Sequence, residues 1–135
     1  MLMTVFERTT PSAMRELDAL TAAVQAFIEA TLDDDLGFRV ALVISEAVTN
    51  AIEHGNRLDE SRSVHVRIEA HGDGSVRVSV ADEGEGFDPA AVPDPLRASA
   101  LLAEGGRGLF LMRELADDLA YEDDGRRVVL TLRAR

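Results

Sequence analysis

The sequence predicts an α/β two-layer sandwich, in which a mixed and mostly antiparallel sheet packs against helices. Two segments repeat apolar residues at three- and four-residue spacing, which is typical of amphipathic helices. Other segments alternate apolar and polar residues at period two, which is typical of strands. Because helices and strands do not alternate strictly along the chain, a doubly wound parallel sheet is not expected. The length of 135 residues fits a single domain over residues 1–135.

The first part of the chain predicts one strand and two helices. A short strand is expected at about residues 3–8, and Thr10-Pro11-Ser12 then supplies a capping hydroxyl and a proline for a helix start. That helix runs to about residue 31. The run Asp33-Asp34-Asp35 places carboxylates at the positive end of a second helix, which extends to Gly55.

The second part of the chain predicts a hairpin, a third helix and two last strands. The segments VHVRIEA (64–70) and SVRVSVA (75–81) alternate at period two around a glycine-containing turn, which indicates a hairpin. A third helix is expected at about residues 108–118, with strands near 119–122 and 127–133. The expected buried face of the hairpin consists of Val64, Val66, Ile68, Val76, Val78 and Val80.

The composition excludes several chemistries. The absence of Cys excludes a thiolate nucleophile, a disulfide and a Cys-ligated metal site. All 14 basic residues are Arg, so the chain also lacks the Lys of a Walker A loop or of a Schiff-base enzyme. The formal net charge of −11 argues against direct binding to nucleic acid or to an anionic membrane. The sequence shows neither a secretory signal nor an apolar span, so we expect a cytoplasmic protein.

The second helix carries a stripe of polar side chains. Glu46 and Asn50 are one helical turn apart, so a carboxylate and an amide oxygen project together. A polar stripe on a helix is either a solvated face or a binding face, and the small residues Ala47 and Ala51 beside it favour the second interpretation. The stripe consists of Arg39, Glu46, Asn50 and Glu53, with His54 at its edge.

Two glycine-containing segments follow the hairpin. Asp82-Glu83-Gly84-Glu85-Gly86-Phe87 comes directly after a strand, and its alternate glycines allow backbone to approach a flat ligand. An Asp at such a strand end can accept a hydrogen bond from an exocyclic amine. Gly105-Gly106-Arg107-Gly108 then leads into a helix, whose N-terminal N–H groups suit an anion such as phosphate. The glycine- and proline-rich segment 82–106 between them is long for a loop, and such loops are usually functional or disordered.

Taken in order, three motifs resemble the N, G1 and G2 boxes of the GHKL ATPase superfamily. The motifs are E-x-x-x-N-x-x-x-H-G from Glu46 to Gly55, D-x-G-x-G-F from Asp82 to Phe87, and G-x-G-L-x-L-M from Gly106 to Met112. Within that superfamily, the compact length and the segment ISEAVTNAIEHGN most resemble the bacterial anti-sigma factor serine kinases of partner-switching systems. The resemblance implies a Bergerat-type ATP-binding fold with a flexible lid at about residues 83–106.

The resemblance also implies roles for individual residues. Asn50 would coordinate Mg²⁺, which suits a hard cation that takes few protein ligands and keeps several waters. Asp82 would accept from the adenine amino group, and Glu46 would act as general base on the attacking hydroxyl. Gly84 and Gly86 would let the base approach, Thr131 would complete the adenine pocket, and Gly106, Arg107, Gly108 and Leu109 would enclose the phosphates. His54 fits the first motif, and a capping role for it stays open beside a ligand contact.

The implied function is ATP-dependent phosphorylation of a Ser or Thr on a small STAS-domain anti-anti-sigma protein, with a sigma factor as the competing partner. A homodimer is an open alternative to a monomer, because relatives often dimerise. Two other functions also stay open. The first is a nucleotide-binding switch that sequesters a partner without significant kinase activity, and the second is an acidic interaction domain that binds no nucleotide. Histidine kinases, topoisomerases and chaperones are disfavoured because they need further domains that 135 residues do not provide.

Overall fold

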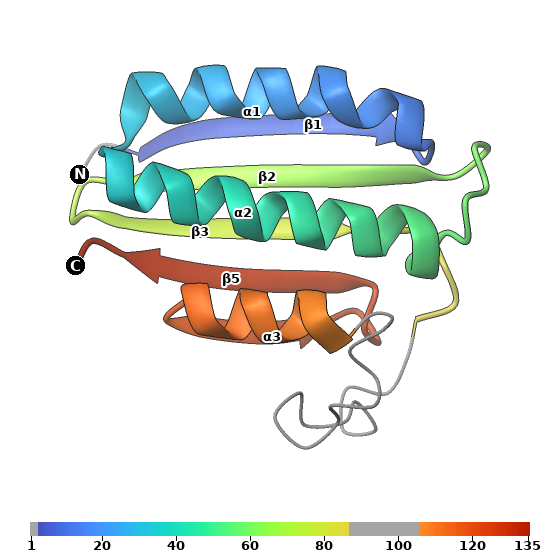
Figure 1. Cartoon of the computed structure of the whole chain (residues 1–135). Helices are drawn as coiled ribbons and strands as arrows, with labels where there is room; N and C mark the ends of the chain where they lie inside the picture. Colours follow the sequence, from blue (N-terminus) through green and yellow to red (C-terminus); the bar gives the residue numbers. More distant parts are fainter. Residues whose placement is uncertain (1–2, 87–105) are drawn as a thin grey trace.

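The computed structural model describes residues 3–86 and 106–135, and within 106–110 it describes the backbone alone. Five strands form one sheet in the order β1-β2-β3-β5-β4 (Figure 1). All four pairings between these strands are antiparallel, so the sheet that was expected to be mixed is wholly antiparallel among the described residues. The strands are β1 (Met3–Pro11), β2 (Ser63–His71), β3 (Ser75–Ala81), β4 (Asp118–Glu122) and β5 (Arg127–Arg133).

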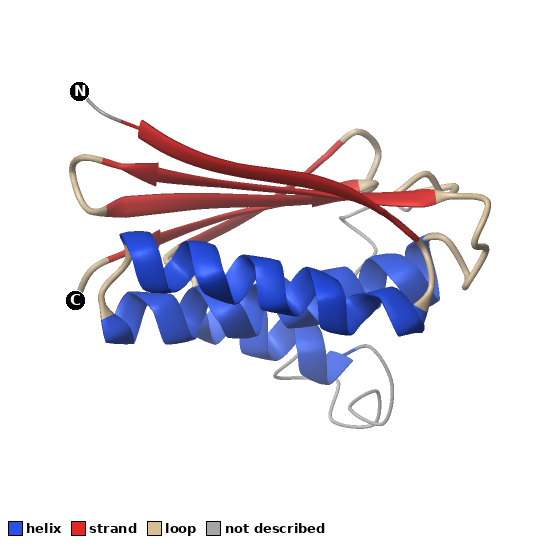
Figure 2. Cartoon of the chain, turned by 90° about the horizontal axis from the view of Figure 1, so that it is seen from above, coloured by secondary structure: helices blue, strands red, loops and turns tan. Residues whose placement is uncertain are grey.

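The described helices all lie on one face of the sheet, which gives the two layers that the sequence predicts (Figure 2). They are α1 (Leu17–Thr31), α2 (Asp34–Asn50) and α3 (Gly106–Leu115). A short 3-10 turn, η1 (Met14–Glu16), precedes α1, and a π-helical turn, η2 (Ala51–Gly55), continues α2. None of the helices in the described ranges is both long enough and apolar enough to cross a membrane.

The first strand and the first helix differ from the prediction at their boundary. β1 continues to Pro11, because Thr10 and Pro11 pair with Val64 and Ser63 of β2. A proline is tolerated there because β1 is an edge strand, where a missing N–H removes no central hydrogen bond. The helical turn therefore begins at Met14, later than the Thr10-Pro11-Ser12 start that was expected. The third helix is shifted in the opposite direction and spans 106–115.

The core lies between the sheet and the helices. Every second residue of β2 and β3 faces the helices, and the six expected hairpin residues are all buried. Leu130 and Leu132 of β5 extend this layer. The helices contribute a second layer of buried aliphatic side chains, which includes Leu20, Val24, Ile28, Val40, Val43, Ile44, Val48 and Ile52.

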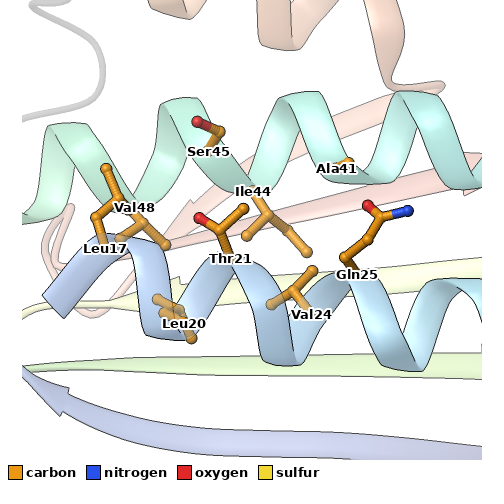
Figure 3. Close-up of a pocket in the computed structure, with 9 residues that line it drawn as sticks. All are labelled: Leu17, Leu20, Thr21, Val24, Gln25, Ala41, Ile44, Ser45 and Val48. Atoms are coloured by element: carbon orange, nitrogen blue, oxygen red, sulfur yellow. The ribbon is translucent and has the colours of Figure 1, made fainter.

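A shallow groove runs between α1 and α2 (Figure 3). Its floor is apolar and its rim carries exposed polar side chains, because the outward faces of the two helices meet there. None of the candidate residues on the three sequence motifs lines it. The lining consists of Leu17, Leu20, Thr21, Val24 and Gln25 from α1 and Ala41, Ile44, Ser45 and Val48 from α2.

The start of α2 confirms the predicted capping cluster. Asp33 has extended backbone angles, and its side chain accepts a hydrogen bond of 2.8 Å from the N–H of Leu36. This bond satisfies one of the N–H groups that lack a partner in the first turn of a helix. Asp34 and Asp35 follow in that first turn, where their charges favour the positive end of the helix dipole.

Replacing the capping side chain should destabilise the fold more than replacing its neighbour. Asp33→Ala removes the hydrogen bond to Leu36 and should lower the free energy of unfolding by about 1 kcal/mol. Asp34→Ala is the matched control, because it removes one exposed carboxylate from the same turn and should cost only about 0.3 kcal/mol. Urea denaturation measures both variants, and equal losses would contradict the assignment of Asp33 as the cap.

Candidate functional site

The three sequence motifs converge at one end of the sandwich. Ala81, the last residue of β3, pairs with Arg127, so Asp82 lies beside the start of β5. The opposite end is marked by Arg39 of α2, which donates hydrogen bonds to the carbonyls of Leu115 and Arg133, the last residues of α3 and β5. Because α2 runs away from Arg39 and α3 runs towards it, the end of α2 and the start of α3 both lie towards the Asp82 end (Figure 1).

Gly55 and the loop after β3 approach each other too closely for side chains. A Cβ atom on Gly84 would lie 1.9 Å from the carbonyl oxygen of Gly55. A Cβ atom on Gly55 would lie 2.3 Å from Oδ2 of Asp82. Both distances are far shorter than any real contact, so the two glycines permit the end of the first motif to touch the start of the second. The structure thereby brings Asp82 and Gly84 together with the turn that contains His54 and Gly55.

Asn56 fixes this junction from the side of α2. Its side chain is fully buried, where Nδ2 donates to the carbonyl of Ser63 at 2.9 Å and Oδ1 accepts from the N–H of Glu83 at 2.8 Å. The backbone N–H of Asn56 donates to the carbonyl of Ala51 at 2.8 Å, which closes the π-helical turn. One amide group therefore connects α2, β2 and the loop that follows β3. π-Helical turns often occur at functional sites.

Arg126 holds the same loop from the other side. Its Nε donates to the carbonyl of Gly84 at 2.8 Å, and its Nη2 donates to the carbonyl of Glu85 at 3.1 Å. Its own carbonyl accepts from the N–H of Asp82 at 2.9 Å. Gly86 has a φ of 78°, and a Cβ atom there would lie 2.2 Å from the carbonyl oxygen of Asp124, so a side chain is excluded.

Sequence reasoning missed both of these residues as parts of the site. A signal for Asn56 was present in the segment ISEAVTNAIEHGN, because an Asn that follows Gly at a helix end is typical of a turn in which the side chain bonds the backbone. No pattern in the sequence marks Arg126, whose role depends on the pairing of β3 with β5.

The carboxyl group of Asp82 is half-buried, and its charge is therefore poorly solvated. Burial raises its pKa above the ordinary value for Asp. The hydrogen bond from the N–H of Gly84 to Oδ1, 2.8 Å long, lowers the pKa by a smaller amount, and so do the charges of Arg126 and Arg62. The carboxyl group is therefore positioned by the backbone and only partly exposed to water, which suits an acceptor for a ligand N–H.

The polar stripe of α2 faces away from the core, apart from Arg39. Glu46 and Asn50 are partly exposed one turn apart, while Glu53 and His54 are exposed. The imidazole of His54 lies 3.9 Å from the carboxylate of Glu53. Arg39 was expected on this stripe, but its side chain is buried and bonds carbonyl groups at the opposite end of the sandwich.

Thr131 does not join the site. In β5 it pairs with Arg77 of β3 and Asp118 of β4, and its neighbours Leu130 and Leu132 occupy the buried face. Because side chains alternate along a strand, Thr131 points to the face of the sheet opposite the helices. It also lies four residues along β5 from Arg127, a distance of about 13 Å at the usual rise per residue. Thr131 therefore does not lie beside Asp82, where it was expected to complete an adenine pocket.

The third motif begins α3. Gly106, Arg107, Gly108 and Leu109 form its first turn, and their side-chain positions lie outside the described residues. The N–H groups of a first turn have no partners within the helix, so they are able to bind an anion. Most of the expected lid, residues 83–106, also lies outside the described residues, which end at 86 and resume at 106.

Comparison with known proteins identifies the family. The family model described as "Histidine kinase-like ATPase domain" matches residues 9–133 of this chain. The serine-protein kinase RsbW of Bacillus licheniformis is 34% identical over 97 residues, which cover 67% of this chain and 60% of the relative. The anti-sigma F factor of Heyndrickxia coagulans is 36% identical over 104 residues, which cover 75% of this chain and 69% of the relative. The serine-protein kinase RsbW of Bacillus subtilis is 34% identical over 88 residues, which cover 61% of this chain and 54% of the relative.

A solved structure shows the same fold. The crystal structure of the RsbU and RsbW domains of a Mycobacterium tuberculosis protein matches 98% of this chain and 32% of its own, with a TM-score of 0.66 and 22% identity. The chain spans about half to two thirds of the length of the curated relatives named above. Since the family model covers nearly the whole chain, the protein belongs to the family of histidine kinase-like ATPase domains.

Proposed function

We propose that the protein binds Mg-ATP at the end of the sandwich where the three motifs meet, and that it transfers the γ-phosphate to a protein. The observation that carries this proposal is the contact between Gly55 and the Asp82–Gly84 loop. The two glycines let the end of the first motif pack against this loop beside one half-buried carboxyl group, an arrangement suited to a flat heteroaromatic base. Membership of the ATPase domain family supports the same ligand.

The base would bind at the Asp82 end of the site. Because Oδ1 of Asp82 already accepts from the N–H of Gly84, the remaining acceptor capacity of the carboxylate is available to the adenine amino group. Asn56 and Arg126 would keep this acceptor in place, since both bond the backbone of the same loop. Neither of them needs to touch the nucleotide.

The phosphates would lie between α2 and the first turn of α3. The N–H groups at the start of α3 suit an anion, and Asn50 offers one amide oxygen from the facing helix. A single hard oxygen donor on a partly exposed helix face fits Mg²⁺, which commonly binds through one or two protein groups together with substrate phosphates. When bound, this metal would offset the negative charge of the phosphates.

Glu46 would act as the general base. It lies one helical turn before Asn50 on the same face of α2, so its carboxylate would accept the proton of a Ser or Thr hydroxyl that approaches the γ-phosphate. The hydroxyl oxygen then bonds to phosphorus, and the bond to the bridging oxygen of ADP breaks. Phosphoryl transfer depends mainly on positioning and charge stabilisation, so this small set of groups is sufficient.

The phosphorylated partner that we propose is a small STAS-domain anti-anti-sigma protein, with a sigma factor as the competing partner. Support comes from relatives that are named serine-protein kinase RsbW and anti-sigma F factor. The alternative is a nucleotide-binding switch that sequesters a partner without significant kinase activity. The carboxylate of Glu46 beside Asn50 favours the kinase, because binding alone does not require a base.

Changing the carboxylate of Asp82 to an amide should weaken nucleotide binding. In Asp82→Asn, an amide oxygen still accepts from Gly84, but the other oxygen becomes an NH2 group that opposes the adenine amino group. We expect the Kd for Mg-ATP to rise by about 10- to 100-fold, measured by isothermal titration calorimetry. Asp18→Asn, which removes an exposed carboxylate on α1, is the control and should bind like the wild type. Unchanged affinity in Asp82→Asn would refute the assigned contact.

The same substitution should stabilise the protein without ligand. A pKa that burial raises in the folded state means that the ionised form of Asp82 opposes folding at neutral pH. Asp82→Asn removes that penalty, so its free energy of unfolding should exceed that of the wild type at about pH 7 and converge with it as the pH falls through the raised pKa. Urea denaturation at several pH values provides the measurement. A difference that stays constant with pH would show that ionisation of Asp82 is not its cause.

Replacing the proposed general base, Glu46, should reduce phosphoryl transfer without weakening nucleotide binding. Glu46→Gln should reduce transfer of labelled γ-phosphate to the cognate STAS-domain protein by about 10²- to 10⁴-fold, while the Kd for Mg-ATP stays near the wild-type value. Glu53→Gln is the matched control, since Glu53 is exposed on the same stripe and should retain full activity. Full activity in Glu46→Gln would remove Glu46 from the role. Nucleotide binding without any transfer by the wild type would favour the switch.

A further inference from the structure

Arg39 is a buried cation that no part of the proposed chemistry uses. Its side chain is almost completely inaccessible to solvent, at 2% relative exposure for the residue. Nε donates to Asp35 at 3.2 Å, Nη1 donates to the carbonyl of Leu115 at 3.2 Å, and Nη2 donates to the carbonyl of Arg133. Nη1 also lies 3.7 Å from the carboxylate of Asp117. Burying a charge is costly unless it is paired and hydrogen-bonded, and here each nitrogen has a partner.

These partners connect α2 with the end of α3. Leu115 is the last residue of α3, so the guanidinium group bonds a carbonyl that has no partner within the helix and lies at the negative end of its dipole. Asp117, in the connection to β4, donates its N–H to the carbonyl of Thr131 at 2.8 Å, and its Oδ2 accepts from the N–H of Arg133 at 2.6 Å. The end of α3 is therefore fixed to both α2 and β5.

The opposite end of α3 is the turn that would bind phosphate. α3 has 10 residues, which corresponds to about 15 Å. A helix of that length moves its first turn by about 2 to 3 Å when it tilts by about 10° about its last residue. Met112 of α3 is buried in the core and Leu115 packs against it, but apolar contacts are not directional and restrain sliding and tilt less than hydrogen bonds do.

We propose that Arg39 is a positioning residue that sets the place of the first turn of α3 relative to Asn50, and thereby the affinity of the site for the phosphates. The inference rests on the proposed function, because it assumes that the phosphates bind between those two elements. The binding of adenine should not depend on Arg39, because Asp82 is held separately by Gly84, Asn56 and Arg126. If Arg39 contributed to stability alone, its replacement would not weaken the binding of the phosphates more than the binding of adenine.

The test compares the binding of two ligands to the wild type, two Arg39 variants and a control variant. Arg39→Met keeps the length of the side chain without its hydrogen bonds, and Arg39→Lys keeps the charge without the planar set of donors. Arg77→Met is the control, since Arg77 is exposed on the other face of the sheet. The Kd values for Mg-ATP and for adenosine are measured for each protein by NMR titration.

We expect Arg39→Met to weaken Mg-ATP binding by about tenfold or more, with adenosine binding within about twofold of the wild type. Arg39→Lys should recover part of the loss, and Arg77→Met should bind both ligands normally. Asp117→Asn is a milder variant in case Arg39→Met fails to fold. It removes the charge facing Arg39, keeps an oxygen for the N–H of Arg133, and should weaken Mg-ATP binding by about twofold to threefold.

Two results would overturn the inference while leaving the proposed function intact. One is unchanged affinity for Mg-ATP in the folded Arg39 and Asp117 variants, and the other is an equal loss of affinity for Mg-ATP and adenosine. A wild-type protein that binds no Mg-ATP would instead overturn the proposed function, and the inference with it.

Discussion

The candidate site depends on the backbone contact between Gly55 and the loop that contains Asp82 and Gly84. A side chain on either glycine would collide with the other segment, at 1.9 Å for Gly84 and 2.3 Å for Gly55. The contact places a half-buried carboxyl group beside the end of α2, and Asn56 and Arg126 hold the loop there from its two sides. The proposed position of the adenine base follows from this contact, and the metal and phosphates would bind next to it, between Asn50 and the start of α3.

Because the protein is strongly acidic, a bound triphosphate would depend on a few individual groups within the site. With a formal net charge of −11 and no Lys, the chain offers neither a positive surface potential nor a phosphate-binding Lys to a triphosphate. In the proposed site, the charge of the phosphates would be offset by individual groups, namely N–H groups at the start of α3 and a metal ion beside Asn50. The buried side chain of Arg39 holds the opposite end of α3, and we propose that it thereby positions these N–H groups.

Much of the fold follows from patterns that act over short distances. Period-two alternation predicts the hairpin of β2 and β3 with its buried face, and the Asp33 cap predicts the start of α2. Three errors have a common cause, since Thr131, Arg39 and Arg126 depend on strand register and on contacts between distant elements. The helical periodicity that places Arg39 on the polar stripe does not show that its side chain contacts the ends of α3 and β5. The sequence of β5 likewise does not show which end of the strand adjoins Asp82.

The most direct test of the account is a map of backbone amide chemical shifts as Mg-ATP is added to the wild-type protein. We expect saturable changes at Gly55, at Asp82–Gly86 and at the first turn of α3. The groove between α1 and α2 and the face of the sheet opposite the helices should change little. The absence of saturable changes, or changes that centre on that groove or that face, would contradict the claim that nucleotide binds where the three motifs meet.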